Sequence, residues 1–161
     1  MSELEKRKHR ACFTGHRPEK LTMDEETLRA VLSDAIDRSI NEGFTTFISG
    51  MARGVDIVAA EIVLKNKERN PNLRLICALP HPDFEKRWSD EWQKRYHHVL
   101  KNADLIKTVC REFSIESYQI RNEWMVKHSA RVLAFFSGAK GGTRNTILYA
   151  ESLGVEVQQL C

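Results

Sequence analysis

Short apolar runs alternate with longer segments of helical periodicity along nearly the whole chain. The runs that predict strands are "ACFT" (11–14), "TTFIS" (45–49), "LRLICAL" (73–79), "ADLIKTVC" (103–110), "RVLAFF" (131–136) and "VEVQQ" (155–159). Each is bounded by Gly, Pro, Asn or charged residues, which is typical of strand ends. Between them the pattern predicts helices near 24–42, 55–68, 84–102, 116–129 and 143–153.

Regular alternation of strand and helix predicts a parallel sheet with helices on both faces. The segment 55–68 illustrates the pattern, because its apolar residues repeat at i, i+3, i+4, i+7 and i+8 and so form one buried stripe. The fold class expected is α/β, a Rossmann-like three-layer α/β/α domain with a mostly parallel sheet over residues 11–161. Residues 1–10 are expected to be a charged N-terminal tail.

Composition narrows the function classes only mildly. The 161 residues are 42% hydrophobic and 29% charged, and 25 Lys and Arg against 22 Asp and Glu leave a net charge of +3. Bulk charge therefore does not favour a nucleic-acid-binding protein. Apolar runs are too short to span a membrane, and "MSELEKRKHR" lacks the apolar core of a signal peptide, so a cytoplasmic protein is expected. The four cysteines are scattered, which argues against disulfides or a zinc site.

The loops that follow the strands carry the candidate chemistry. They read "TGHRP" (14–18), "SGMARGVD" (49–56), "PHPDF" (80–84) and "SGAKGGTRNT" (137–146), and three of the four combine glycine with a hydroxyl residue. Glycine exposes backbone N–H groups, and a helix N-terminus adds a positive dipole end, so together they predict an anion site. Each loop alone is equally typical of ordinary turn chemistry. None matches the fingerprints of dinucleotide dehydrogenases or P-loop NTPases.

Four of these motifs, in this order, also resemble a known group of proteins. "TGHRP", "SGMARGVDIVAAEIVL", "RNEWMV" and "GAKGGTRNT" are similar to the SLOG superfamily, which is Rossmann-like and related to the DNA-processing protein DprA and to the LOG phosphoribohydrolases. The strongest likeness is to small bacterial proteins of the YpsA type, the DUF1273 family, from about residue 11 onward. The resemblance implies the fold and a site for a nucleotide or an ADP-ribose-like ligand, more firmly than it implies an activity.

The residues expected to bind the ligand lie in these motifs. Asp56 is one turn into the helix after the glycine loop, where it either caps the helix or accepts hydrogen bonds from a ribose or base. Arg17 is placed to donate two hydrogen bonds to a phosphate. The full set expected at the site is Thr14, Gly15, His16, Arg17, Ser49, Gly50, Met51, Ala52, Gly54, Asp56, Arg121, Asn122, Gly141, Gly142 and Thr143.

The resemblance to LOG enzymes also bears on catalysis. A corresponding helix in those enzymes carries a catalytic arginine, and Arg121 is the matching candidate. "GGT" (141–143) is similar to the end of the LOG motif P-G-G-x-G-T-x-x-E, but the proline is missing and Thr146 stands where the motif has its glutamate. Threonine cannot replace a carboxylate as an acid or base. A hydrolase would need another acid, for which Glu61, Asp56 and Glu123 are the candidates.

An i+4 series of Phe84, Trp88, Trp92, Tyr96 and Leu100 is predicted to wind around one helix, because i+4 steps advance about 40° each. Phe84 and Trp88, near the helix N-terminus, are the members expected to stack on a base. The other three are expected to be buried against the sheet or a second subunit. His97 and His98 are adjacent, which is poor metal-ligand spacing, so no metal site is expected.

The function expected is a nucleotide or nucleotide-derivative binding protein, acting as a sensor or binding module. One alternative is an enzyme that hydrolyses the N-glycosidic bond of a nucleotide. A second alternative is a DprA-like binder of single-stranded nucleic acid, which "KHSARV" (127–132) favours and the weak net charge does not. The partner expected is a small nucleotide-type molecule, with no membrane association and with a homo-oligomer left open.

Overall fold

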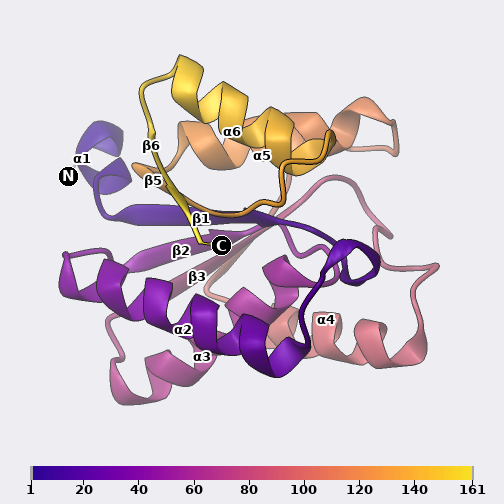
Figure 1. Cartoon of the computed structure of the whole chain (residues 1–161), viewed down its shortest axis with the longest axis horizontal. Coiled ribbons are helices and arrows are strands. Elements are labelled where there is room, and N and C mark those ends of the chain that lie inside the picture. Colours follow the sequence, from indigo (N-terminus) through magenta and orange to yellow (C-terminus); the bar gives the residue numbers. More distant parts are fainter. Residues whose placement is uncertain (1, 161) are drawn as a thin grey trace.

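A six-stranded sheet runs through the centre of the molecule, and all of its strands are parallel (Figure 1). The computed structural model describes residues 2–160. The strands lie in the spatial order β4-β3-β2-β1-β5-β6. Their bounds are β1 Arg10–Gly15, β2 Thr46–Ser49, β3 Arg74–Leu79, β4 Leu105–Thr108, β5 Arg131–Phe135 and β6 Glu156–Gln159. The six predicted strands are therefore confirmed, as is the Rossmann-like α/β class.

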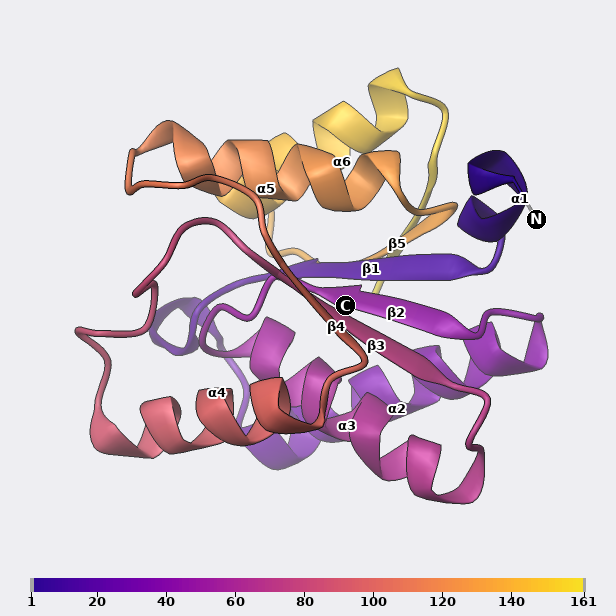
Figure 2. The same ribbon diagram turned by 180° about the vertical axis from the view of Figure 1, so that it is seen from behind.

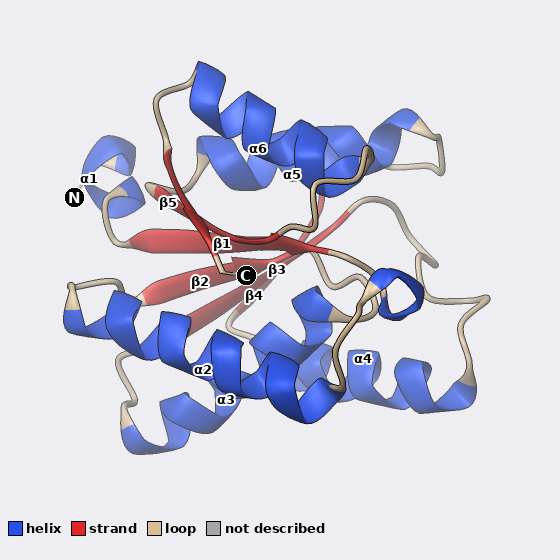
Figure 3. Ribbon diagram, in the orientation of Figure 1, coloured by secondary structure: helices blue, strands red, loops and turns tan. Residues whose placement is uncertain are grey.

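Helices cover both faces of the sheet (Figures 2 and 3). One face carries α2 (Glu25–Asn41), α3 (Val55–Arg69) and α4 (Asp90–Asn102), and the other carries α5 (Glu116–Lys127) and α6 (Gly142–Ser152). Two short helices complete the chain, α1 (Glu3–Arg7) and the 3-10 helix η1 (Pro18–Lys20). The three-layer arrangement follows from apolar strand residues facing alternately up and down, so that each face needs its own cover.

Each face of the sheet has its own hydrophobic core. Phe13 and Phe47, on adjacent strands, stack with ring centroids 5.9 Å apart under α2 and α3. On the opposite face Cys12 and Ile48 pack with Met125 of α5. The predicted stripe of 55–68 lies in the first core, where Val55, Val58, Ala59, Ile62 and Val63 are all buried.

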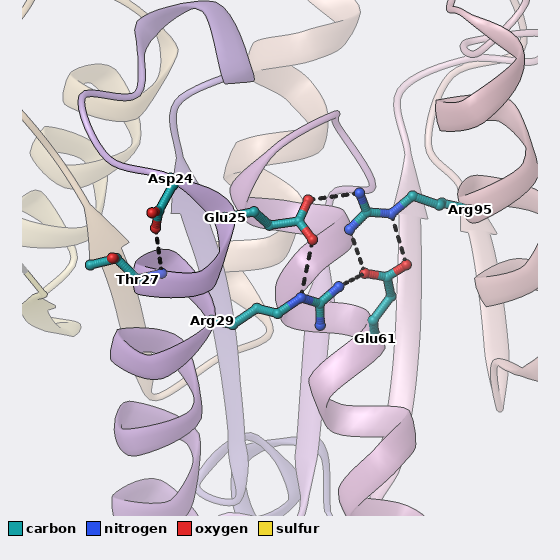
Figure 4. Close-up of polar contacts among 6 residues, drawn as sticks. All are labelled: Asp24, Glu25, Thr27, Arg29, Glu61 and Arg95. Atoms are coloured by element: carbon teal, nitrogen blue, oxygen red, sulfur yellow. Dashed lines mark hydrogen bonds and ion pairs between the residues drawn. The ribbon is translucent and has the colours of Figure 1, made fainter.

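A network of four charged side chains joins the three helices of one face (Figure 4). Glu61 of α3 accepts from Arg29 of α2 at 2.6 Å and from Arg95 of α4 at 2.7 and 3.0 Å. Glu25 accepts from Arg29 at 3.1 Å and from Arg95 at 2.8 Å. The side chains of Arg95 and Glu61 are only 18% and 20% exposed, so water screens this network less than a surface pair.

Two sequence expectations need correction. Residues 2–10 are not a simple tail, because α1 begins at Glu3 with Ser2 as its cap, Arg7 donates to the Ser129 carbonyl, and Arg10 already belongs to β1. Met1 and Cys161 lie outside the described residues.

The helix predicted from residue 84 begins instead at Asp90, with Ser89 as its N-cap. Asp83 has a positive φ of 63°, and the turns that follow hold Phe84 and Trp88 outside the helix. The i+4 spacing was therefore misleading at its first two positions. Trp92, Tyr96 and Leu100, which do lie on α4, pack against the core as expected.

Candidate functional site

The order in which successive strands are added to the sheet changes direction between β1 and β5. The segment after β1 leads to α2 on one face, while the segment after the neighbouring β5 leads to α6 on the other. The two connections diverge and leave a crevice at the carboxyl ends of the strands, which is where ligands bind in open α/β sheets. A cavity of about 470 Å³ lies there, a size typical of small-molecule sites.

Loops from four strands and one helix line this cavity. Its walls come from the segments after β1, β2, β3 and β5 and from α5. Cations predominate among its charged lining residues, and Asp56 is the one carboxylate in the described lining. The cationic residues are Arg17, Lys20, Arg53, Arg121 and Lys140. The lining therefore favours an anionic ligand.

Asp56 and Arg121 form the buried floor of the cavity. Asp56 is 6% exposed, its Oδ2 accepts from the Ala52 N–H at 3.3 Å, and its Oδ1 has no hydrogen-bond partner. Burial raises the pKa of the Asp56 carboxyl to about 6, and the nearby Arg121 charge only partly opposes this. Arg121 is 5% exposed, and burial lowers the pKa of its guanidinium. An arginine nevertheless stays protonated in proteins.

The guanidinium of Arg121 is oriented by fixed acceptors. Its Nε donates to Asn122 Oδ1 at 2.8 Å, and its Nη1 donates to the backbone carbonyls of Gly50 and Ala78. The group also lies 5.6 Å from the centre of the Phe84 ring. These acceptors thus hold the Arg121 guanidinium in one orientation.

Gly50 leaves room for both of these side chains. A Cβ on Gly50 would lie 3.0 Å from Arg121 Cζ and 3.0 Å from Asp56 Oδ2, which is tighter than ordinary contact. The next residue, Met51, is fully buried with a φ of 62°, a conformation that non-glycine residues rarely adopt. Its N–H donates to Ser49 Oγ, and that hydroxyl donates to the Asp56 carbonyl at 2.8 Å. The loop is shaped to position Asp56.

The loops after β1 and β2 approach each other at two glycines. A Cβ on Gly54, whose φ is 91°, would lie 2.6 Å from the His16 carbonyl oxygen. A Cβ on Gly15 would lie 2.6 Å from side-chain atoms of Val55. Both positions therefore require glycine for packing. The resulting close contact holds the backbone at His16 against the start of α3.

Aromatic side chains form one wall of the cavity. Phe84, Trp88 and Tyr118 line it, and the Phe84 and Trp88 rings meet edge to face with centroids 5.0 Å apart. Behind them His81 is buried against Phe84 and Tyr118, and its Nδ1 lies 2.7 Å from the Pro82 carbonyl. Such a wall offers π faces to which a planar base can stack.

The structure brings most of the predicted binding residues to this cavity. Those that line it are Thr14, Gly15, His16, Arg17, Ala52, Asp56, Phe84, Trp88, Arg121, Asn122, Gly141, Gly142 and Thr143. The residues Ser49, Gly50, Met51 and Gly54 are not among the lining residues, but they contact lining residues or lie beside one another in the same loop. At Gly50 the anion site predicted for the glycine-bearing loops does not fit this geometry, because Arg121 and Asp56 occupy the space beside it.

Several lining residues were missed by sequence reasoning. Arg53 and Lys140 belong to loops that had been recognised, so the signal was a cation within a glycine-bearing segment, whereas Lys20 lies in η1, just beyond the loop 14–18. Tyr118 lies one helical turn before Arg121 on α5, on the face that Arg121 shares. Phe13 is a core residue of β1 whose contribution had no sequence signal.

Of the carboxylates proposed as substitutes for the LOG glutamate, Asp56 alone lines the cavity as described. Glu61 is engaged by Arg29 and Arg95, and Glu123 accepts from Gln119 at 3.2 Å. Thr146 is fully buried, and its hydroxyl donates to the Gly142 carbonyl at 2.8 Å. Any carboxylate chemistry in this cavity would therefore fall to Asp56.

The rest of the described chain offers a weaker alternative site. A hollow of about 530 Å³ lies at the opposite edge of the sheet, where Arg10 pairs with Glu3 and Asp104 pairs with Lys67. Two of its charged lining residues, Arg10 and Asp104, thus already have ionic partners in the protein. Within residues 2–160 no group of three or more His, Cys, Asp or Glu side chains is arranged to hold a metal ion, and no helix is long and apolar enough to cross a membrane.

The family of the chain is given by comparison with known proteins. The family model YpsA, described as the YspA SLOG family, matches residues 11–155. The chain belongs to this family. It is also 33% identical over 138 residues to the SPbeta prophage-derived protein YoqJ of Bacillus subtilis, covering 78% of this chain and 79% of that one. The predicted SLOG resemblance is confirmed.

Other matches extend this result. The UPF0398 protein BH1768 of Halalkalibacterium halodurans is 30% identical over 106 residues, which are 65% of this chain and 56% of that relative. Among solved structures, DNA processing protein A from Helicobacter pylori superposes with a TM-score of 0.65 at 16% identity, covering 96% of this chain and 66% of that one. The structure of TM1055 gives a TM-score of 0.59 at 16% identity, covering 92% and 71%. These likenesses show a shared fold.

Proposed function

We propose that this SLOG-family protein binds a nucleotide or a nucleotide derivative and acts as a binding module or sensor. The observation that carries the proposal is the mixed lining of the cavity between β1 and β5. Cations and the N-terminus of α6 line it together with the aromatic side chains of Phe84, Trp88 and Tyr118. A nucleotide has the matching chemistry, with an anionic phosphate at one end and a planar base at the other.

The phosphate end is expected near the start of α6. Gly141 precedes the helix with a φ of 145°, and a Cβ there would lie 4.0 Å from Lys20 Nζ, so the lysine reaches this turn. Lys140 lies in the same segment. Free N–H groups at a helix N-terminus, together with a lysine, are a common phosphate site.

A thermal-shift panel tests the proposal. Adenine and guanine ribonucleotides and ADP-ribose are added at millimolar concentration to the purified protein. A ligand present at about 100 times its dissociation constant stabilises the fold by about 2.7 kcal/mol, which is measurable as a higher Tm. Native mass spectrometry of freshly purified protein would identify any ligand that co-purifies. A well-folded sample that none of these ligands stabilises would contradict the proposal.

Two alternatives rest on specific observations. The unpartnered Oδ1 of Asp56 supports hydrolysis of an N-glycosidic bond, because a buried carboxyl with a pKa of about 6 is suited to acid–base chemistry.

The second alternative is a nucleic-acid ligand. The DNA processing protein A structure is described as binding single-stranded DNA, and its shared fold supports such a ligand. An oligonucleotide would bind with a strong salt dependence, which titration at two salt concentrations measures.

A further inference from the structure

Asp56 is a buried carboxylate whose hydrogen bonds within the protein are incomplete. It is buried and lines a cavity whose other charged residues are cations, yet its Oδ1 has no hydrogen-bond partner. Buried polar atoms in folded proteins are nearly always paired. Its other oxygen, Oδ2, accepts from the Ala52 N–H at 3.3 Å and lies beside Gly50. A donor on the ligand is the partner that fits.

The chemistry of a nucleotide limits which part can supply that donor. Phosphate oxygens are anionic acceptors, so they are repelled by a carboxylate and attracted to Lys20, Lys140 and Arg17. The base has its own wall of Phe84, Trp88 and Tyr118. The ribose, which links the two ends, carries hydroxyl groups that donate to carboxylates, as occurs in other Rossmann-like folds.

We propose that Asp56 makes this site selective for ribonucleotides over 2′-deoxyribonucleotides by accepting a hydrogen bond from the ribose hydroxyls. This inference rests on the proposed nucleotide-binding function and adds a specificity to it. The discrimination depends on the 2′-hydroxyl: a 2′-deoxy ligand cannot supply this donor to Asp56 Oδ1, whereas a ribonucleotide can. The ligand is thus a free ribonucleotide or a derivative that keeps its vicinal hydroxyls, and DNA is disfavoured.

Matched pairs of ligands test the selectivity. Isothermal titration calorimetry compares AMP with 2′-deoxy-AMP and GMP with 2′-deoxy-GMP on the same preparation. The wild-type protein is expected to bind the ribonucleotide of the preferred base roughly 10- to 100-fold more tightly, which is the range for a hydrogen bond to a charged group. Asp56→Asn, which is nearly isosteric, is expected to weaken ribonucleotide binding by a similar factor and to abolish the discrimination.

The control is Asp34→Asn on α2, which also removes one negative charge but from a side chain that is 71% exposed. It is expected to keep both the affinity and the discrimination. Equal affinity of wild-type protein for the ribo and deoxy forms would overturn the inference and leave the proposed function standing. Binding of AMP but not of IMP, with no difference between AMP and 2′-deoxy-AMP, would assign Asp56 to the base and also overturn it. Failure of every nucleotide to bind would refute the proposed function itself.

Discussion

The backbone N–H of Ser137 donates to His16 Nε2 at 3.1 Å, and the Ser137 hydroxyl lies 2.9 Å from the same nitrogen. This contact links the segment after β5 to the segment after β1, where the order of successive strands in the sheet changes direction. Because Nε2 accepts from a backbone N–H, the imidazole is neutral in this arrangement. The loops on the two sides of the cavity are therefore joined by a group that titrates.

Acidification is expected to weaken this connection. Burial, assisted by the Lys20 charge, lowers the pKa of His16. A histidine whose folded pKa is lowered contributes stability that is present above its unfolded pKa of about 6.5 and is lost as pH falls through the folded value. Thermal unfolding of the wild type and of His16→Gln, followed against pH, measures this contribution. The difference in Tm between them should shrink toward acid pH, and a constant difference would contradict the assignment.

Ligand affinity is expected to rise with pH through the titration of Asp56. Its pKa is raised by burial to about 6, and an ionised carboxylate accepts hydrogen bonds better than a protonated one. The ligand therefore binds the deprotonated form preferentially, so affinity should increase from about pH 5 to about pH 7.5 and then level off. ADP-ribose is the suitable probe, because its diester pyrophosphate lacks the phosphate ionisation near pH 6.

Other groups around Asp56 set the control for that experiment. Protonation of His16 at acid pH adds positive charge and would favour an anionic ligand. It would therefore raise affinity as the pH falls, whereas the titration of Asp56 lowers it. Asp56→Asn should therefore remove the rise in affinity toward neutral pH, whereas a rise that persists in this variant must come from another group. The titratable and charged neighbours are Cys12, His16, Arg17, Lys20, Arg53, Tyr118, Arg121 and Lys140.

Two glycine substitutions should reduce binding for different reasons. Gly50→Val would displace Arg121 and Asp56, so it is expected to lower both ligand affinity and Tm. A Cβ on Gly142 would lie 3.8 Å from Asn122 Nδ2, an ordinary contact, so Gly142→Val should change Tm little and lower affinity through contact with the ligand. Calorimetry and thermal unfolding of both variants check this. Full affinity in a folded Gly142→Val protein would remove this turn from the binding site.

The network around Glu61 is expected to contribute to stability and not to binding. Glu61→Gln removes the charge that Arg29 and Arg95 share, in a partly buried position, so the free energy of unfolding should fall by about 1–2 kcal/mol. Urea denaturation measures the change, and Asp34→Asn, which loses one exposed pair, should change it little. Loss of ligand affinity in Glu61→Gln would show that this carboxylate acts at the site after all.

Hydrolysis of nucleoside monophosphates is expected to be weak or absent. The position of the LOG glutamate is held by Thr146, which is buried and bonded to the Gly142 carbonyl, and an acid–base group is typically worth about 10²–10⁴-fold in rate. Holding substrate and transition state equally well does not accelerate the chemical step. Release of free base and ribose 5-phosphate from AMP and GMP is the assay. Robust turnover that is abolished in both Asp56→Asn and Arg121→Ala would establish the enzyme instead.

The aromatic series shows where pattern reasoning has to fail. The spacing of Phe84, Trp88, Trp92 and Tyr96 is helical throughout, yet the helix begins only at Asp90. Ser89 caps it, and the positive φ of Asp83 belongs to a turn that packs Phe84 against Arg121 and His81. Phe84 and Trp88 line the cavity, but they do so from a loop. Only contacts with residues distant in the chain decided that conformation.

The sequence by itself determined the order and type of the main elements. Strands and helices bury residues at different spacings, and these spacings can be read from residues close together in the chain. It also located the glycine-bearing loops, since turns and helix starts depend on local backbone freedom. Only the tertiary structure decided that Asp56 Oδ1 has no hydrogen-bond partner near Arg121, and that Gly50 leaves room for these side chains. Burial, pKa and pairing depend on what the fold brings together from β2, α3 and α5, and no local pattern records those distances.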